Sequence, residues 1–380
     1  MDALTTPLPK DWQRVRLGDI AEIKRGVRIT KNELDVFGKY PVVSGGVGFL
    51  GYTNNFNRYE NTITIAQYGT AGYVNFQKNK FWANDICFCV YPNKDVIKNI
   101  FLYYFLKVNQ NYLYEISNRN ATPYSISKDK ILDFEILLPP LNEQIAIANI
   151  LSDVDRYLYS LDALILKKES VKKALSFELL SQRKRLKGFN QAWQKVRLGD
   201  IGKPCMCKRV MKHQTTPYGE IPFYKIGTFG NTADAFISKK LFLEYKTKYS
   251  FPKKGDILIS ASGTIGRAVI YDGKPAYFQD SNIVWIDNDE TLVKNDFLFY
   301  AYSNIKWNTE YTTILRLYND NFRNTLIPLP PLNEQIAIAN ILSGLDNEII
   351  SLKNKKRQFE NIKKALNHDL MSAKIRVLKK

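Results

Sequence analysis

Apolar residues recur at alternating spacings of four and three positions along two long stretches of the chain. They are Ile147, Leu151, Val154, Leu158, Leu161, Ile165, Leu175 and Leu179 in the first stretch, and Ile338, Leu342, Leu345, Ile349, Leu352, Phe359, Leu366 and Leu370 in the second. Each stretch predicts a helix of about 45 residues, roughly 65 Å long at 1.5 Å per residue. A heptad spacing of this length favours pairing of the two helices as a coiled coil, although two separate amphipathic helices are the alternative. Because globule and helix alternate along the chain, we expect the pairing to be antiparallel.

A pair of prolines marks the start of each predicted helix. Pro139-Pro140 precedes the first helix and Pro330-Pro331 the second, and proline is tolerated at the start of a helix but not inside it. Asn142 is the expected N-cap of the first helix. Glu143 follows it, where a carboxylate interacts favourably with the positive end of the helix dipole.

The segments before the two proline pairs have a different pattern. Short runs of β-branched and apolar residues, such as 61–66 and 256–260, alternate with glycine, asparagine and proline. Such runs predict short strands joined by turns. We therefore expect a mixed α+β fold with two globules, each followed by one long helix.

Three sequence strings occur twice, which predicts a pseudo-twofold molecule. The string 12–20, Trp-Gln-Arg-Val-Arg-Leu-Gly-Asp-Ile, returns with one substitution at 193–201, and the string 138–152 returns unchanged at 329–343. The offset between copies grows from 181 to 191 residues, so the second copy contains ten additional residues between these strings. A Gly-Thr-x-Gly string also appears in both copies and predicts a turn.

The net charge of the chain indicates what kind of partner it binds. There are 55 Lys and Arg residues against 37 Asp and Glu, which gives a net charge of +18 and a pI of about 9.5. This excess favours a polyanion, most often a nucleic acid, with a membrane surface as the alternative. No run of eighteen apolar residues predicts a membrane span, and the first residues do not resemble a signal peptide. We expect a cytoplasmic protein.

Histidine and cysteine are too scarce to favour a metal site. The chain has two histidines, and its four cysteines form two Cys-x-Cys pairs. Cys87 and Cys89 lie in an apolar run that predicts a buried strand with reduced thiols on one face. A zinc site that includes Cys205, Cys207 and His213 is the less favoured alternative, because zinc ligands usually have two to four residues between them.

Motifs for catalysis are missing or misleading. The glycines of 46–51 fit G-x-G-x-x-G, but the following residues do not open a helix, so a turn is favoured over a dinucleotide site. We find no phosphate-binding loop, no signature of base methylation, no nucleophile elbow and no convincing metal-dependent nuclease cluster. The sequence therefore predicts a binding protein, not an enzyme.

The doubled Leu-Pro-Pro-Leu-Asn-Glu-Gln string, each copy followed by a long helix, resembles the specificity subunit of type I restriction–modification enzymes. The Trp-x-x-Val-x-Leu-Gly-Asp-Ile opening of each copy and the stretch 255–266 resemble the same family. The match covers essentially the whole chain in the family's order. The resemblance implies two target recognition domains, residues 1–138 and 188–329, and two spacer helices, residues 139–187 and 330–380.

The resemblance also implies a function. Each globule would read one half of a bipartite, gapped site in double-stranded DNA, while the paired helices would hold the halves apart and dock two methyltransferase subunits. S-adenosylmethionine and the methylation chemistry would belong to those subunits, and a restriction (motor-nuclease) subunit would add DNA translocation and cleavage where one exists. The chain itself would need no cofactor and no metal.

Candidate DNA-contacting residues are loop side chains of the two globules that could reach base edges or a thymine methyl group. They are Arg25, Arg28, Gln67, Tyr68, Tyr73, Arg119 and Tyr124 in the first copy, and Arg209, Ser260, Ser262, Arg267, Arg316 and Arg323 in the second. Because most protein–DNA hydrogen bonds go to phosphate and sugar, a phosphate contact or a core position is the alternative for each. Gln67-Tyr68 corresponds to Ala261-Ser262, which predicts different half-sites.

Basic residues of the helices, within 167–173 and 353–357, are expected to form a solvated face. Arg183 to Arg185 are expected to do the same, with partner docking as the alternative. Two other functions stay open from the sequence. One is an orphan site-specific DNA-binding protein without modification partners, and the other is a coiled-coil scaffold with no role on DNA.

Overall fold

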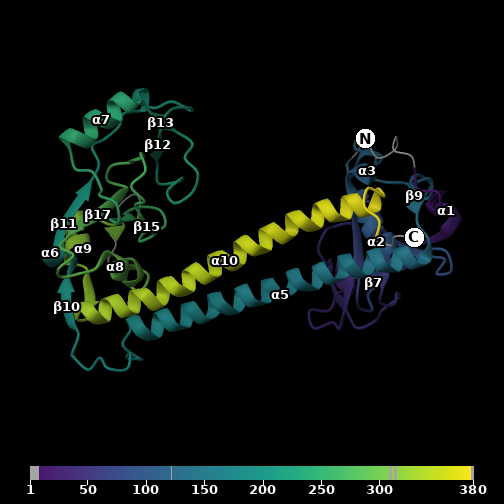
Figure 1. Ribbon diagram of the computed structural model, residues 1–380, viewed down its shortest axis with the longest axis horizontal. Helices are drawn as coiled ribbons and strands as arrows, with labels where there is room; N and C mark the ends of the chain where they lie inside the picture. The colour runs from purple at the N-terminus through teal and green to yellow at the C-terminus, as the bar shows by residue number, and fades with distance from the viewer. Residues whose placement is uncertain (1–7, 121, 308–309, 312–314, 378–380) are drawn as a thin grey trace. The chain divides into compact units, whose positions relative to one another are not determined.

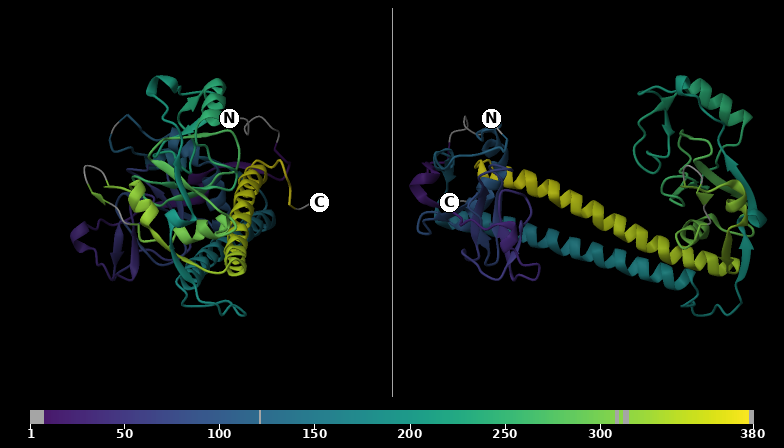
Figure 2. Two further views of the ribbon diagram at one scale, coloured as in Figure 1. Left: turned by 90° about the vertical axis from the view of Figure 1, so that its left-hand side faces the viewer. Right: turned by 180° about the vertical axis from the view of Figure 1, so that it is seen from behind.

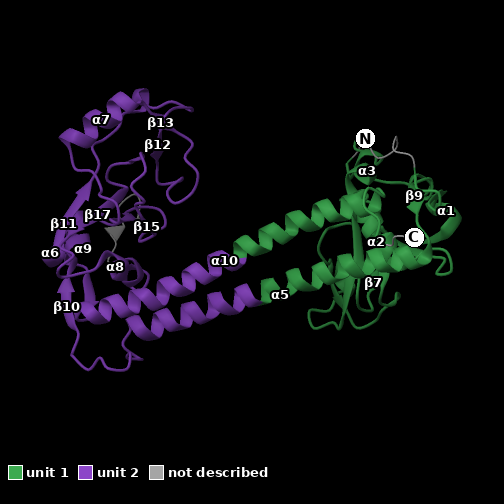
Figure 3. Cartoon of the chain, in the orientation of Figure 1, with its two compact units in different colours: residues 1–163, 353–380 green, residues 164–352 purple. Residues whose placement is uncertain are grey.

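The computed structural model describes residues 8–120, 122–307, 310–311 and 315–377. The chain divides into two compact units (Figure 3). Unit 1 comprises residues 1–163 and 353–380, and unit 2 comprises residues 164–352. Each unit therefore contains one globule together with a part of each long helix.

The globule of unit 1 is built on small sheets (Figure 1). A four-stranded antiparallel sheet has the strand order β2 (Ala21–Arg25), β8 (Cys87–Pro92), β5 (Thr62–Ala66), β6 (Val74–Gln77). A three-stranded sheet, parallel only between its last two strands, has the order β4 (Gly51–Thr53), β3 (Tyr40–Val43), β7 (Trp82–Ala83). A third pair joins β1 (Gln13–Arg16) to β9 (Glu135–Leu138). The helices are α1 (Leu17–Ile20), α2 (Asn99–Val108), α3 (Gln110–Glu115), α4 (Lys128–Leu132) and the 3₁₀ turn η2 (Lys31–Glu33).

Unit 2 repeats this topology strand by strand. Its four-stranded sheet has the order β11 (Gly202–Met206), β17 (Ile283–Asn288), β14 (Ile257–Ser260), β15 (Ala268–Ile270). Its three-stranded sheet has the order β13 (Phe236–Ile237), β12 (Ile221–Tyr224), β16 (Tyr277–Phe278), and β10 (Gln194–Arg197) pairs with β20 (Leu326–Leu329). The helices are α6 (Leu198–Ile201), α8 (Asn295–Tyr302), α9 (Asn319–Asn324) and η3 (Lys212–Gln214). The internal repeat predicted from the sequence is thus a repeat of structure.

The two copies differ where their loops differ. Helix α7 (Lys239–Lys248) fills the connection from β13 to β14, whereas the equivalent connection from β4 to β5 in unit 1 has no helix. This helix lies in the part of the second copy that contains the ten additional residues. In unit 2, β18 (Glu310–Tyr311) also pairs antiparallel with β19 (Leu315–Arg316).

An interior strand anchors the core of each globule. β5 has the sequence Thr-Ile-Thr-Ile-Ala, and all five residues are buried, which suits β-branched side chains in an interior strand. Helix α2 covers one face of the sheet, so that Phe101 and Phe105 join Ile63 and Ile65 in one hydrophobic cluster. β14 and α8 do the same in unit 2.

The cysteines of β8 lie where the sequence predicted them. Cys87 and Cys89 are buried free thiols on one face of the strand and share a hydrophobic cluster with Phe81. The interaction with Cys89 and burial raise the pKa of the Cys87 thiol well above its usual value. Cys207, just after β11, is also buried, and burial raises its pKa to about 12. Within the described residues, no three His, Cys, Asp or Glu side chains are grouped so that they could hold a metal ion.

The long helices are α5 (Leu141–Leu180) and α10 (Leu332–Met371), each 40 residues long. The prediction that Asn142 caps the first helix is wrong, because α5 already begins at Leu141. The carbonyl oxygen of Pro140 accepts hydrogen bonds from the backbone nitrogens of Glu143 and Gln144, both at 3.0 Å, and so starts the helix. Among the described residues, no helix is both long and apolar enough to cross a membrane.

The two helices pair antiparallel in each unit (Figures 1 and 2). In unit 1, Lys356 of α10 pairs with Asp162 of α5 at 2.6 Å, and Lys363 pairs with Asp155. The residue number rises on one helix as it falls on the other, which confirms the predicted direction. Heptad residues form the seam between these ion pairs; for example, Leu161 is 5% exposed.

In unit 2 the same arrangement uses lysines of α5. Lys168 pairs with Glu348 at 2.8 Å and Lys172 with Asp346 at 2.5 Å. Lys168 and Lys172 occupy positions of the heptad seam, and about 30% of each side chain is exposed. The expectation of a purely solvated basic face is therefore wrong for these lysines, which bridge the two helices.

The two repeated strings contact each other within each unit. Trp12 precedes β1 and donates its indole N–H to the buried carboxylate of Glu143, at 3.1 Å. Trp193 donates equivalently to Glu334 at 2.9 Å. Because β1 pairs with β9 and β10 with β20, the opening string of each copy holds the start of its long helix against the globule.

An arginine that follows the other long helix completes each contact. Arg376, after α10, donates to both oxygens of Glu143 at 2.6 and 2.7 Å and also pairs with Asp11. Arg185, after α5, donates to both oxygens of Glu334, at 2.9 and 2.8 Å. These bidentate pairs compensate carboxylates that are almost fully buried. Arg185 is thus a structural ion-pair residue, not part of a solvated face.

Candidate nucleic-acid interface

The Gly-Thr-x-Gly turn leaves the interior strand of each four-stranded sheet. In unit 1, Gly69 and Gly72 have φ of +78° and +87°, and in unit 2 Gly263 and Gly266 have +65° and +82°, a region that favours glycine. A Cβ on Gly72 would lie 2.7 Å from a backbone oxygen, and one on Gly266 would lie 2.1 Å from the indole nitrogen of Trp307. Glycine is therefore required for the turn to pack this closely, and most of the predicted DNA-contacting residues lie near it.

Two predicted residues of unit 1 contact each other directly. Arg25, the last residue of β2, donates from Nε and Nη2 to Oε1 of Gln67, at 2.9 and 2.5 Å. Gln67 is 8% exposed, whereas Arg25 is exposed to solvent. The guanidinium also lies 6.0 Å from the ring centre of Phe88. A buried amide thus holds an exposed cation in one position.

A groove of about 960 Å³ lies beside the turn in unit 1. It brings together three predicted residues, Tyr68, Arg119 and Tyr124, with Tyr114, which sequence reasoning missed. The guanidinium of Arg119 lies 5.3 Å from the ring centre of Tyr114 and 5.2 Å from that of Tyr124. A cation held against aromatic rings can contact a phosphate, and the rings offer faces for stacking.

The glycines of the apparent dinucleotide motif form one wall of this groove. Gly46 and Gly48 line it, and Gly51 begins strand β4, where a dinucleotide site would require a helix. The prediction of a glycine-rich turn is confirmed. The other two candidates of unit 1 are not among the residues that line the groove. The ammonium of Lys107 lies over Tyr73, 4.3 Å from the centre of the tyrosine ring, and Arg28 is exposed in the loop after β2.

In unit 2 a hydrogen-bonded set joins Ser262 and Arg316. Ser262 Oγ donates to Asn282 Oδ1 at 2.9 Å, and Arg316 Nη2 donates to the same oxygen at 3.4 Å and to the carbonyl of Ser281 at 3.0 Å. Ser262 and Arg316 also form a β-bridge. Arg209 follows strand β11 in the sequence. Its Nε pairs with Oδ2 of Asp280 at 2.9 Å.

The remaining candidates of unit 2 are spread over different settings. Ser260 is 2% exposed, donates its hydroxyl to the carbonyl of Thr264 and accepts from the backbone nitrogen of Arg267 at 3.0 Å, so its hydrogen bonds shape the turn. Arg267 has an exposed side chain that reaches Asn231 at 3.5 Å. Arg323 lies on α9 and packs beside Gly199 of α6. Whether any of these residues contacts a base stays a prediction.

Residues that sequence reasoning missed are partners of the predicted ones. Asn282 and Asp280 orient Arg316 and Arg209, and Tyr114 flanks Arg119. Asn282 and Asp280 are far from Arg316 and Arg209 in the sequence, so local spacing does not connect these partners, whereas Tyr114 lies only five residues before Arg119.

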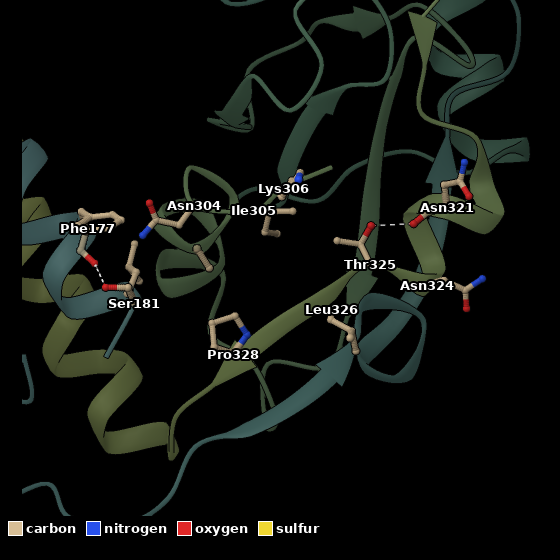
Figure 4. A pocket seen from close by; sticks show the side chains of 12 residues that line it. Phe177, Ser181, Asn304, Ile305, Lys306, Asn321, Asn324, Thr325, Leu326 and Pro328 are labelled. Carbon is tan, nitrogen blue, oxygen red and sulfur yellow. Dashed lines mark hydrogen bonds between the residues drawn. The ribbon is translucent and has the colours of Figure 1, made fainter. Parts of the chain in front are cut away.

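Unit 2 contains a pocket whose lining differs from that of the groove in unit 1. It has a volume of about 440 Å³ and lies between the end of α5, the end of α8 and the segment from α9 to β20 (Figure 4). Phe177, Ala301 and Leu326 contribute apolar surface, while amide side chains such as Asn304 and Asn324 contribute polar groups. The described residues that line it include no carboxylate and no histidine.

Exposed apolar residues recur at matching positions of the two long helices. On α5, Ile145, Tyr159 and Val171 are 45%, 78% and 45% exposed. Their counterparts on α10, each 191 residues later, are Ile336, Ile350 and Ile362, which are 41%, 55% and 51% exposed. Exposed apolar positions of this kind are candidates for contact with another protein.

Comparison with known proteins identifies the family. The family described as type I restriction modification DNA specificity domain matches residues 9–168 and 190–361, one match for each copy. A putative type I restriction enzyme specificity subunit of Haemophilus influenzae is 40% identical over 345 residues, which cover 87% of this chain and 86% of that protein. The putative MjaX specificity subunit of Methanocaldococcus jannaschii is 28% identical, and the alignment covers 97% and 95% of the two chains.

The fold agrees with this relationship. The crystal structure of a type I restriction–modification S subunit from M. genitalium matches with a TM-score of 0.66 and 21% identity, over 96% of this chain and 98% of that chain. The protein is thus a DNA-specificity protein with a doubled α+β fold. It belongs to the family of type I restriction–modification specificity subunits, as the resemblance in its sequence predicted.

Proposed function

We propose that the chain reads a bipartite, gapped site in double-stranded DNA, with one half-site for each unit. The observation that carries the proposal is the repeated sheet and glycine turn with different side chains at equivalent positions. Gln67 and Tyr68 follow β5, whereas Ala261 and Ser262 follow β14. The same framework with different polar groups suits two unequal sequences, because base edges are distinguished by donor and acceptor patterns.

The net charge of +18 supports binding to DNA. Cationic side chains that neutralise phosphates release counterions, so affinity should fall steeply as salt increases. The exposed Arg25, Arg119 and Arg267 are suited to such contacts or to bases, whereas Arg185 and Arg376 are engaged with buried carboxylates. The interface therefore uses only part of the positive charge.

The proposal includes two methyltransferase subunits as partners. The exposed apolar positions that repeat on α5 and α10 support two equivalent docking surfaces, and hence one specificity chain with two methyltransferases. S-adenosylmethionine and methyl transfer would belong to those subunits, and a restriction subunit, where the host has one, would join through them. In this proposal the chain itself is non-catalytic and acts in the cytoplasm, where the DNA is.

The test combines mass and methylation. The chain is purified alone and together with the methyltransferase encoded with it, and each sample is assayed for methyl transfer, nuclease and ATPase activity. We expect an inactive isolated chain, a complex of one specificity chain with two methyltransferases by native mass spectrometry, and methylation of one gapped motif in a host that expresses both. Activity of the isolated chain, or binding to all duplexes alike, would contradict the proposal.

Paired variants connect this test to the structure. Arg119→Ala should weaken DNA binding, because the guanidinium is exposed between two tyrosines of the groove. Arg156→Ala is the matched control, since Arg156 is an exposed arginine of α5 with an ion pair to Asp153. Equal losses in both variants would mean that the groove has no particular role in DNA binding.

A further inference from the structure

We infer that Gln67 is a positioning residue that aligns the guanidinium of Arg25 for a guanine in the half-site of unit 1. The inference rests on the proposed DNA-reading function and adds a role to one of its residues. From its residue type alone, Gln67 is a candidate reader of adenine, through its own amide group. The contacts in unit 1 assign it a different task.

The backbone of Gln67 is fixed by two hydrogen bonds. Its backbone nitrogen donates to the carbonyl of Ile86 at 2.9 Å, and its carbonyl accepts from the nitrogen of Ile126 at 2.9 Å. Because the side chain is 8% exposed, little of the amide is accessible to a DNA base. Its oxygen instead accepts two hydrogen bonds from one edge of Arg25. An acceptor on a buried side chain with a fixed backbone restricts the conformations of the arginine that donates to it.

Arg25 keeps its other edge for a ligand. A guanidinium has five N–H groups, and Gln67 takes one from Nε and one from Nη2. Within the described part of the chain, Nη1 forms no hydrogen bond, so Nη1 and the second N–H of Nη2 form a free pair of parallel donors. This pair matches O6 and N7 of guanine in the major groove. The carbonyl of Arg25 is held as well, by Nη2 of Arg58 at 2.5 Å.

Unit 2 has no equivalent of this pair. The strand registers place Met206 at the position of Arg25, because Met206 faces Val284 as Arg25 faces Phe88. Ala261 stands where unit 1 has Gln67. An apolar pair at the same place cannot present two parallel donors. The structure therefore assigns this mode of guanine recognition to unit 1 only.

The experiment measures binding of the complex with the methyltransferase to its methylated motif, and to duplexes with each base pair of that motif replaced in turn. Arg25→Ala should reduce discrimination at one G·C pair by about tenfold or more, the range for a bidentate contact. Gln67→Leu, which keeps the volume but removes the acceptor, should reduce discrimination at the same pair by about three- to tenfold, because the arginine must be ordered on binding. Gln67→Glu keeps an acceptor for Arg25 and should preserve discrimination at this base pair.

The double variant and a control separate positioning from other roles. If Gln67 acts through Arg25, Gln67→Leu should have no further effect in a chain that already carries Arg25→Ala. Gln77→Ala removes another buried glutamine of the same sheet, bonded to Thr64 at 3.1 Å, and should leave discrimination unchanged. The base pairs of the other half-site provide an internal reference.

Several results would overturn the inference. They are an effect of Gln67→Leu at a base pair that Arg25→Ala leaves alone, a uniform loss over all sequences, or additive losses in the double variant. The first would make Gln67 a reader in its own right, and the second would make Arg25 a phosphate contact. If the unaltered complex showed no sequence preference at all, the proposed function would fail first, and this outcome differs from every result above.

Discussion

A buried carboxylate at the start of each long helix shows how single residues position whole elements. Glu143 and Glu334 are 2% and 1% exposed, and each accepts hydrogen bonds from a tryptophan and an arginine. The tryptophan belongs to the opening of the same copy, while the arginine follows the long helix of the other copy. In unit 1 the contact joins three segments that are distant in sequence, whereas in unit 2 Glu334 is distant from Arg185 and Trp193, which are close to each other in the sequence. Each contact fixes where a helix leaves its globule.

Arg185→Ala should destabilise unit 2 by about 2–3 kcal/mol, because it leaves the buried charge of Glu334 with one donor only. Hydrogen exchange of β14 and β17 should become faster, while β5 and β8 in unit 1 keep their protection and act as reference. Lys184→Ala is the matched control, since Lys184 is exposed in the same segment. Equal acceleration in both variants, or in both units, would contradict the assignment.

At the scale of elements, ion pairs beside the apolar seam define the register of the two long helices, that is, which residues of α5 face which residues of α10. Lys356 lies opposite Asp162 and Lys363 opposite Asp155, so a step along α5 corresponds to an equal step back along α10. Ion pairs of partly exposed groups add little stability on their own. They do set which residues face each other, as charged positions beside a heptad seam commonly do.

Inserting one heptad into both helices should widen the gap of the DNA site. Insertions after Leu161 and after Lys356 lie directly opposite each other and keep the pairs Asp162–Lys356 and Asp155–Lys363. Seven residues lengthen each helix by about 10 Å at 1.5 Å per residue. On DNA this is about three base pairs, at roughly 3.4 Å each.

The same three base pairs rotate the duplex by about 100°, because a turn takes 10–10.5 base pairs, so affinity should also fall. Sequencing the methylated bases of a host with this variant provides the measurement. Both half-sites should be unchanged wherever methylation survives. An insertion in α5 alone, which shifts the register, is the control and should disrupt pairing. A motif with the original gap would show that the helices do not set the spacing.

At the scale of the whole molecule, the repeat makes the chain modular. Each unit has its own sheets and its own hydrophobic cluster, and the contacts that attach a helix to a globule are the same in both. The differences are concentrated in connections such as α7 and in the residues that follow β5 and β14. A framework of this kind can change one recognition surface without changing the other.

Exchanging residues 188–329 for those of another family member should change one half-site and leave the other intact. Arg185 and Glu334 lie outside the exchanged segment, so the donor needs to supply only the tryptophan equivalent to Trp193 to rebuild the contact. The reciprocal exchange of residues 1–138 should alter the opposite half-site. Methylome sequencing of both chimaeras is the measurement, and a change of both half-sites by one exchange would refute modular reading.

Local spacing was sufficient to determine the repeat, the two long helices, the strands β5 and β14 and the family. These features depend on periodicity and on strings that occur twice, such as the openings at Trp12 and Trp193, which can be compared along the sequence alone. The antiparallel direction also followed from the alternation of globule and helix. The start of α5 was missed by two residues, because the helix already begins at Leu141 and the carbonyl of Pro140 receives the N–H groups of Glu143 and Gln144.

Only the tertiary structure decided what individual polar side chains do. It buried Ser260 in a turn, joined Arg25 to Gln67, and turned Arg185 toward Glu334. The physical reason is the separation of the partners along the chain: Arg25 and Gln67 are 42 residues apart, and Arg185 and Glu334 are 149 residues apart. Spacing along the chain specifies which face of a strand or helix a residue occupies, but its hydrogen-bond partner is set by packing between elements.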